Sequence, residues 1–310
     1  MLPQVALSIA VLALASSVVS AQQDGDLLLE FRTQLVEVPF RAADRNNHPI
    51  SDLKAEEIKV YENDTPVEIV SLQRTETQPL SFALLIDRSG SMQTLYDEVS
   101  KAAVEFFDRA LKSPKDTAAV IAFQREVHLI QPPTQDKSLL KQAINKKNLI
   151  INEANILNPF QNNLRFNGTA LIAAIHIAVD EVLRRSKSRR VVVLLSDGYD
   201  SESGIELREV LDYAWRNEVT IYAIGIGELN SLNREVLERL CASTGGRTFY
   251  LTAGETLSSA LNSIDDDLRK QYIVSFYPSE QQEGFRSIRL ELPGRPQAKL
   301  RHRLGYYSFR

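Results

Sequence analysis

An apolar run that ends abruptly at a carboxylate constrains the fold of this chain more than any other feature. Residues 80–86 are almost all apolar and predict a strand buried on both faces, as in a parallel sheet covered by helices. Asp87 follows at once, and Ser89 and Ser91 lie on the loop after it. Open α/β sheets place their ligand sites on such loops, at the carboxyl ends of strands. Three oxygen-bearing side chains in this position indicate a site for a hard divalent cation.

Two later segments are expected to complete this site. One carboxylate and two hydroxyls carry too little negative charge to hold a bare divalent ion, so further oxygens are needed. Thr169 opens a strongly periodic helix at 169–185, and Asp197 follows a second apolar run at 191–195. The second run repeats the design of a strand that stops at a carboxylate. The sequence therefore predicts three loops that converge at one edge of the sheet.

The candidate ligands have a family resemblance. In chain order they are Asp87, Ser89, Ser91, Thr169 and Asp197. This order, with Gly198 after the last aspartate, resembles the metal-ion-dependent adhesion site of von Willebrand factor A-type domains. The resemblance implies that the serines and the threonine bind the metal directly, whereas the aspartates act mainly through coordinated water. We expect Mg²⁺, with Mn²⁺ or Ca²⁺ as alternatives.

Asp200 lies three residues after the last of these aspartates. Two roles are open to it. It can stabilise its own loop as an Asx residue, which is the reading we favour, or it can support the metal ligands by hydrogen bonding.

The resemblance extends over nearly the whole chain after its first residues. The segments LVEVPF at 35–40, LLIDRSGSM at 84–92, SDGYDSESG at 196–204 and YIVSFYP at 272–278 occur in this order. The chain is thus similar to the secreted bacterial VWFA-related proteins, which are abundant in Acidobacteria. One departure is Asp64, which stands at a turn where glycine is expected and leaves the hairpin geometry there open.

The two ends of the chain have a different pattern from its centre. Residues 27–78 alternate with the two-residue period of antiparallel strands, and residues 272–310 also read as strands. Each end has too few strands to be stable alone, so we expect both to form one small β-sandwich-like module. Helices and strands alternate through 79–271, which predicts an inserted A-type domain: an α/β, doubly wound, mostly parallel, Rossmann-like sheet.

Within this domain an asparagine-rich segment at 146–166 interrupts the alternation. Long loops inside compact domains are uncommon and often functional. It is either a surface excursion packed by its own apolar residues or a rim of the partner-binding face.

The first residues predict export. Residues 1–21 read as a signal peptide because a short apolar core at 5–15 precedes the small residues Val19, Ser20 and Ala21. Cleavage after Ala21 would release the protein to the periplasm or the extracellular space. Contact with a membrane is expected only if this segment stays uncleaved. The single cysteine, Cys241, has no partner for an internal disulfide and reads as a buried thiol.

Several function classes lack their sequence signals. The net charge is −4 and no basic stripe or nucleic-acid motif occurs, so a nucleic-acid partner is not expected. The four histidines are scattered, and neither an HExxH pair, a GxSxG elbow nor a P-loop is present. A phosphotransfer site of the haloacid-dehalogenase type would need a second aspartate where Ser89 stands. We therefore predict a protein that is not an enzyme.

The residues and the resemblance together favour an exported, divalent-cation-dependent protein-binding protein of the adhesion or scaffold type. Neutral hydroxyl ligands leave a bound cation able to accept one more anion, so the expected partner is a protein that supplies a carboxylate. Two alternatives remain. One is a structural envelope protein with a purely structural metal, and the other is a Mg²⁺-dependent phosphotransfer enzyme.

Overall fold

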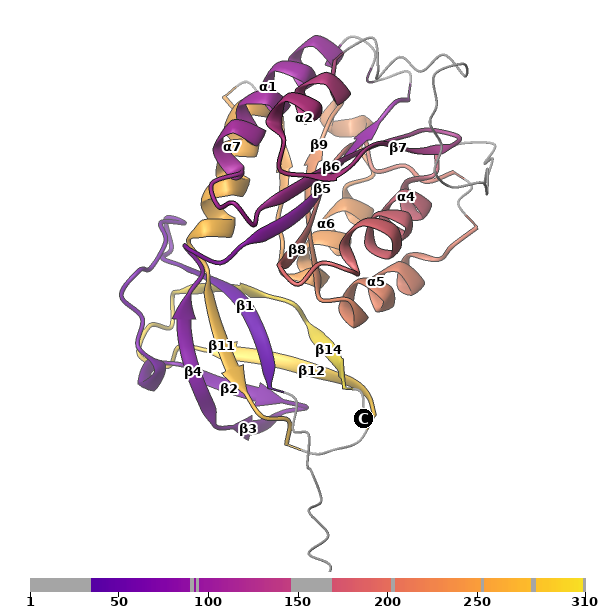
Figure 1. The fold of residues 1–310 in the computed structure, drawn as a ribbon. Coiled ribbons are helices and arrows are strands. Elements are labelled where there is room, and N and C mark those ends of the chain that lie inside the picture. Colours follow the sequence, from indigo (N-terminus) through magenta and orange to yellow (C-terminus); the bar gives the residue numbers. More distant parts are fainter. Residues whose placement is uncertain are drawn as a thin grey trace, which may run out of the picture. The chain divides into compact units, whose positions relative to one another are not determined.

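The computed structural model describes residues 35–89, 92, 95–145, 169–201, 204–251, 254–279 and 283–308. The central part of the chain forms a six-stranded sheet covered by helices (Figure 1). Strands before and after this part form two smaller antiparallel sheets. The signal peptide predicted at 1–21, Ser91 and the asparagine-rich segment at 146–166 lie outside the described residues.

The large sheet is the mostly parallel sheet that the apolar runs predict. Its strand order is β10-β9-β8-β5-β6-β7, so its first strand in the sequence, β5, lies in the interior. Neighbouring strands are parallel except β6 and β7, which form an antiparallel hairpin at one edge. The strands are β5 (Leu80–Asp87), β6 (Thr117–Phe123), β7 (Val127–Thr134), β8 (Arg189–Ser196), β9 (Val219–Gly225) and β10 (Thr248–Tyr250).

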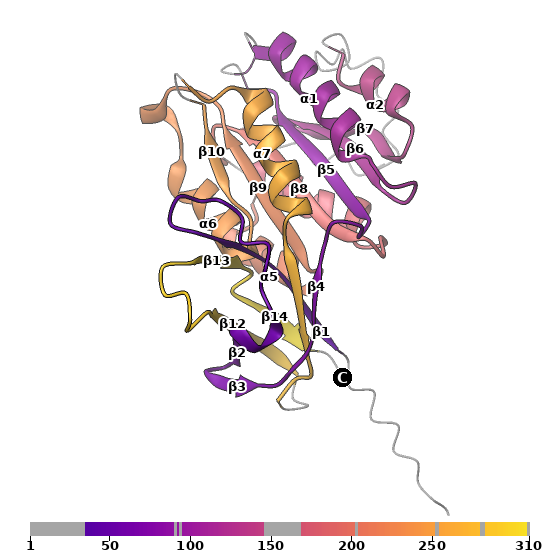
Figure 2. The ribbon, with the colours of Figure 1, turned by 90° about the vertical axis from the view of Figure 1, so that its left-hand side faces the viewer.

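Strand β5 is buried along its whole length because helices cover both faces of the sheet (Figures 1 and 2). Phe82 and Leu84 pack into one hydrophobic cluster, whereas Ala83 and Leu85 pack into the other, as the two-residue period of a strand requires. On the first face lie α1 (Tyr96–Ala110), α2 (Lys137–Ala143) and α7 (Leu257–Arg269). On the second lie α4 (Leu171–Ile177) with its π-helical continuation η4 (Ala178–Leu183), α5 (Leu207–Arg216) and α6 (Arg234–Thr244).

The smaller sheets combine strands from both ends of the chain. One has the order β13-β1-β11-β4 and the other β14-β12-β2-β3. The N-terminal strands are β1 (Val36–Ala43), β2 (Lys59–Glu62), β3 (Thr65–Val67) and β4 (Ile69–Arg74), and a short helix, η1 (Ala55–Glu57), precedes β2. A second short helix, η5 (Leu229–Ser231), belongs to the large domain and follows β9. The C-terminal strands are β11 (Tyr272–Phe276), β12 (Gly284–Glu291), β13 (Lys299–His302) and β14 (Gly305–Ser308). The two sheets share one apolar cluster, so the predicted fold class is confirmed.

Two turns in these sheets settle points that the sequence left open. Asn63 and Asp64 have φ values of 47° and 62°, and β2 pairs directly with β3 around them. Positive φ at both positions is the type I′ hairpin geometry, which asparagine and aspartate tolerate. From the sequence we expect one strand at 299–306, but these residues belong to two strands, β13 and β14, in different sheets. The chain bends between them, and a Cβ at Gly305 would lie 2.4 Å from the Arg286 carbonyl oxygen.

Cys241 lies on α6 and is a free thiol with 1% of its surface exposed. Burial raises its pKa to about 12, so the thiol stays protonated and unreactive at neutral pH. This confirms the prediction of a buried thiol.

Candidate metal centre

Asp87 ends β5 and is completely buried. Its Oδ1 atom accepts a hydrogen bond of 2.8 Å from the Ser89 N–H, and the Ser89 hydroxyl also bonds to this carboxylate. Its Oδ2 atom accepts a hydrogen bond of 2.8 Å from the Ser196 hydroxyl. The carboxylate is therefore fixed by its own loop on one side and by the end of β8 on the other.

The position of Asp197 follows from the pairing of β5 with β8. These strands are parallel, with Ile86 opposite Leu195, so the residues after them leave the sheet side by side. The Asp197 carbonyl oxygen accepts a hydrogen bond of 2.9 Å from the Asn233 N–H, and its Oδ1 accepts one of 3.1 Å from the Tyr199 N–H. Its carboxylate is half-buried and close enough to Asp87 to raise that residue's pKa.

Gly198 is needed for this turn. Its φ is +87°, a conformation that favours glycine, and a Cβ there would lie 2.7 Å from the Asn233 carbonyl oxygen. Its N–H donates to the Ser196 hydroxyl at 3.0 Å, which in turn donates to Asp87.

Thr169 is held next to both strand ends by bonds to its backbone. Its N–H donates to the Ser201 hydroxyl at 2.7 Å, and its carbonyl oxygen accepts from the Ser201 N–H at 3.0 Å. The Ala170 N–H donates to the Gln124 carbonyl oxygen at 2.7 Å, just beyond the end of β6. Since β6 pairs with β5, these bonds join all three loops at the carboxyl edge of the sheet.

Asp200 makes a hydrogen bond outside its own loop, to the start of the helix that follows Thr169. Its Oδ1 accepts a hydrogen bond of 3.0 Å from the Ile172 N–H in the first turn of α4. The N-cap residue of this helix, Ala170, makes no side-chain cap, so a carboxylate from another loop satisfies one of its free N–H groups. Asp200 thus bonds to the backbone three residues after Thr169.

The structure thus brings Asp87, Ser89, Thr169 and Asp197 to one edge, while Ser91 lies outside the described residues. Two contributors were not predicted from the sequence. Ser196 orients Asp87, and Ser201 holds Thr169. Their only sequence signal is their position beside predicted ligands at a strand end and in the following loop.

The residues fit a hard divalent cation. Burial raises the pKa of Asp87 to about 6, and the adjacent Asp197 charge acts in the same direction. Within the described part of the chain, no arginine, lysine or histidine forms an ion pair with Asp87. A bound cation would provide the missing positive charge. The described residues contain no cluster of three or more histidine, cysteine, aspartate or glutamate side chains suited to a metal.

The chain is similar to a curated protein and to solved structures. A curated protein of Borreliella burgdorferi, described only as uncharacterized, is 26% identical over 157 residues, or 49% of this chain and 42% of that protein. The match thus spans less than half the length of that relative. A structure of proximal thread matrix protein 1 from the mussel byssus has a TM-score of 0.50 and 18% identity, over 74% of this chain and 50% of that one. Another structure of that protein, described with a zinc-occupied MIDAS motif, has a TM-score of 0.49 and 18% identity over 67% and 49% of the two chains.

The sequence itself matches a family. The model for the von Willebrand factor type A domain matches residues 82–264, which is more than half of the chain. The matched range contains most of β5, all of β8 and the three loops that bring the candidate ligands together. The chain therefore belongs to the von Willebrand factor type A domain family.

Proposed function

We propose that this protein is an exported adhesion or scaffold protein that binds a partner protein through a divalent cation, with Mg²⁺ as the expected ion. Ser89, Ser91 and Thr169 would hold the ion directly, and Asp87 and Asp197 would hold it mainly through water. The observation that carries the proposal is the buried Asp87, which meets hydroxyl-bearing loops and has no basic ion-pair partner among the described residues.

The bonding within the site supports a role in binding. The loops are joined by bonds from the backbone and from Ser196, Asp200 and Ser201, so the chain's own contacts help to hold the candidate ligands at one edge. An ion held by neutral hydroxyls and two carboxylates at this edge would attract a further anionic oxygen. A carboxylate of a partner protein would supply it. No step of this proposal requires a reaction, so we propose a binding protein and not an enzyme.

Export remains part of the proposal and rests on residues 1–21. None of the helices among the described residues is both long and apolar enough to cross a membrane. We propose association with a membrane only if the N-terminal segment is not cleaved.

The proposal is tested by partner capture from an envelope extract. The purified chain is immobilised, and bound proteins are compared in Mg²⁺ and in EDTA. We expect one or more proteins to bind in Mg²⁺ and to be released by EDTA, and Asp87→Ala to bind none of them. Asp52→Ala, which removes an exposed aspartate of the small module, is the matched control and should behave as the parent chain.

The alternative of a purely structural metal predicts a different outcome. EDTA would then lower the melting temperature of the parent chain while captured proteins stay bound for as long as the chain is folded. Partner binding that survives EDTA in the folded protein would contradict the proposed function.

A further inference from the structure

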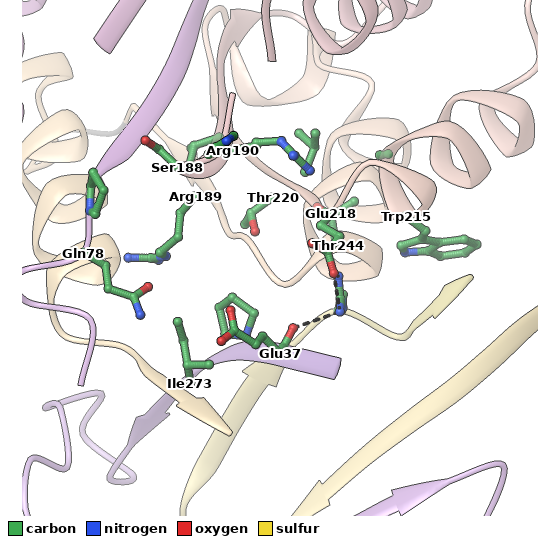
Figure 3. A pocket seen from close by; sticks show the side chains of 17 residues that line it. Glu37, Gln78, Ser188, Arg189, Arg190, Trp215, Glu218, Thr220, Thr244 and Ile273 are labelled. Atoms are coloured by element: carbon green, nitrogen blue, oxygen red, sulfur yellow. Dashed lines mark hydrogen bonds and ion pairs between the residues drawn. The ribbon is translucent and has the colours of Figure 1, made fainter. Parts of the chain in front are cut away.

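A cavity of about 350 Å³ lies at the end of the large sheet opposite Asp87 (Figure 3). The beginnings of β8 and β9 border it on one side, and β1 and β11 of the small module border it on the other. Its volume falls within the range of small-molecule sites, about 300–1,000 Å³. It has room for on the order of ten water molecules, so only a small ligand would fit.

The cavity lining has an excess of positive charge. Lys187, Arg189, Arg190 and Arg303 line it, and the acidic residues of the lining are Glu37 and Glu218. One of these acids is already matched, because both terminal nitrogens of Arg303 lie 3.1 Å from Glu218. The Nε atom of Arg303 is buried and has no hydrogen-bond partner in the described part of the chain.

The guanidinium of Arg189 has no such match. It donates to the Leu268 carbonyl oxygen at 2.9 Å and to the side-chain oxygen of Gln271, which are both neutral. Among the described residues no carboxylate pairs with it. Arg189 is partly buried, and its desolvation together with the nearby Arg269 lowers its pKa to about 10. A partly buried charge without a counter-charge is unfavourable unless something else compensates it.

Arg190 is the next residue of β8 and lies on the opposite face of the sheet, where its bonds also go to neutral groups. Its guanidinium donates to the carbonyl oxygens of Ser186 and Asn217, at 2.7–3.0 Å. A guanidinium carries five N–H donors, so both arginines keep donors beyond those that these bonds use. Such donors bind carboxylate and phosphate oxygens strongly because their hydrogen bonds are charge-assisted.

We propose that this cavity is a binding site for a small organic anion whose carboxylate or phosphate group contacts Arg189, while Arg190 on the other face of the sheet adds to the positive charge of the lining. The ligand would lie between the sheet of the A-type domain and strands β1 and β11. It would supply the negative charge that the lining lacks. The site is separate from the candidate metal centre, because it lies at the amino ends of the same parallel strands.

The chain carries its own reporter for this site. Trp215 is its only tryptophan and lines the cavity. Its fluorescence is followed while succinate or inorganic phosphate is added to the full-length chain at an ionic strength kept constant with NaCl. Succinamide serves as the neutral analogue of succinate. We expect a saturable change with succinate, with phosphate or with both, and none with succinamide.

Variants assign the response to the cavity. Arg189→Gln removes the unmatched charge and should weaken binding at least tenfold. Ser188→Phe fills the cavity without removing a charge and should weaken binding to the same extent, so it decides the test if Arg189→Gln fails to fold. Arg295→Gln is the matched control, because Arg295 pairs with Asp52 and Glu57 away from the cavity. It should bind as the parent chain does.

Two results would overturn the proposal. One is a parent chain whose Trp215 fluorescence shows no saturable response to either anion. The other is a response that is as strong in folded Arg189→Gln and Ser188→Phe as in the parent chain.

Discussion

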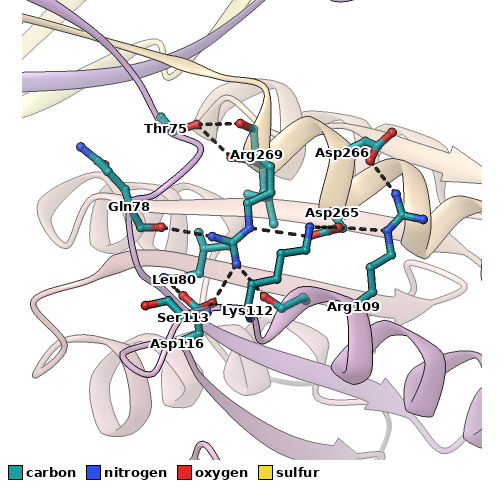
Figure 4. A network of polar contacts seen from close by, with 12 residues as sticks. Thr75, Gln78, Leu80, Arg109, Lys112, Ser113, Asp116, Asp265, Asp266 and Arg269 are labelled. Atoms are coloured by element: carbon teal, nitrogen blue, oxygen red, sulfur yellow. Dashed lines mark hydrogen bonds and ion pairs between the residues drawn. The ribbon is translucent and has the colours of Figure 1, made fainter.

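Buried carboxylates at the two ends of the large sheet differ in whether a basic group pairs with them. At the end that meets the small module, Asp116, Asp265 and Asp267 are almost fully buried, and each lies within about 3 Å of a basic group. Asp116 pairs with Arg269 at 2.9 Å, and Asp265 with Arg109 at 3.0 Å (Figure 4). Within the described residues, Asp87 at the other end has only hydroxyl and N–H partners and an acidic neighbour.

This difference separates structural acids from a candidate ligand. Arg269 also donates to the Ala110 carbonyl oxygen, and Asp116 accepts the Leu80 N–H that begins β5. This network of ion pairs and hydrogen bonds joins α7, α1 and β5 through the chain's own residues alone. Asp87 has an equally buried position, but it forms no ion pair with a basic group among the described residues. The comparison therefore predicts that the two sets of acids respond differently to mutation, pH and metal.

The largest expected effect is a loss of stability when Asp267, which joins α7 to the small module, is replaced. Asp267 lies 2.6 Å from Nε of Arg41 and 2.8 Å from a terminal nitrogen of Arg301, which belong to β1 and β13. Asp267→Asn leaves these guanidiniums without their counter-charge, and we expect it to lower the free energy of unfolding by about 3–5 kcal/mol. Urea unfolding in EDTA measures this loss, and Mg²⁺ affinity should stay unchanged below the transition.

Asp266→Asn on the same helix is the control. Its carboxylate is half-exposed and pairs with exposed parts of Arg109 and Lys270, so its loss should cost less than about 1 kcal/mol. Equal losses of unfolding free energy in the two variants would mean that the buried ion pairs of Asp267 stabilise the protein no more than the exposed pairs of Asp266.

A smaller effect is expected from the pH dependence of Asp87. Its pKa of about 6 in the folded protein exceeds its usual value of 3.8, so the folded state binds the proton more tightly than the unfolded state does. In EDTA, stability should therefore fall as the pH rises from about 4 to about 6, by on the order of 2–3 kcal/mol. Asp87→Asn should remove this part of the slope, which urea unfolding of both proteins at pH 4, 5, 6 and 7 would reveal. Identical slopes would show that Asp87 is not destabilised by its burial.

Ser89→Ala and Thr169→Ala should separate metal binding from folding. Each removes a proposed direct ligand but no large buried group, so Mg²⁺ affinity should fall at least about tenfold, or 1.4 kcal/mol. Melting temperatures in EDTA should stay close to that of the parent chain. Wild-type affinity in both variants, measured by titration calorimetry, would show that these hydroxyls are not ligands.

The smallest expected effect is that of Ser201→Ala. It removes the hydroxyl that accepts the Thr169 N–H but keeps the backbone bond between the same residues. We expect a loss of about 0.5–1.5 kcal/mol in stability and a Mg²⁺ affinity lowered severalfold, because Thr169 is held less firmly. Ser258→Ala, which removes a surface bond to Glu105, should leave the affinity unchanged. An affinity as low as that of Thr169→Ala would indicate that Ser201 itself binds the ion.

The main elements could be predicted from the sequence because local patterns determine them. The buried run before Asp87 indicates a strand with helices on both faces, and the alternating residues of both chain ends indicate an antiparallel module. Individual hydrogen bonds and close contacts between residues distant in the sequence could not be predicted. The role of Ser196 follows only from the register of β5 against β8, and the bend before Gly305 follows from its close approach to Arg286.

The same limit applies to the acids and bases. Asp116, Asp265 and Asp267 lie in ordinary loop and helix segments, and no local pattern distinguishes them from solvent-exposed residues. Their arginine partners are distant in the sequence: Arg41 and Asp267 come from opposite parts of the chain. The cavity beside Arg189 is likewise formed only when the two chain ends pack below the large sheet.

The central claim is tested most directly by titrating Mg²⁺ into the metal-stripped protein in a calorimeter, beside Asp87→Asn under the same conditions. The account predicts one saturable site per chain in the parent protein. It predicts no saturable heat in Asp87→Asn, although that variant is folded in EDTA. The absence of Mg²⁺ binding to the parent protein, or equal binding to both proteins, would contradict the account.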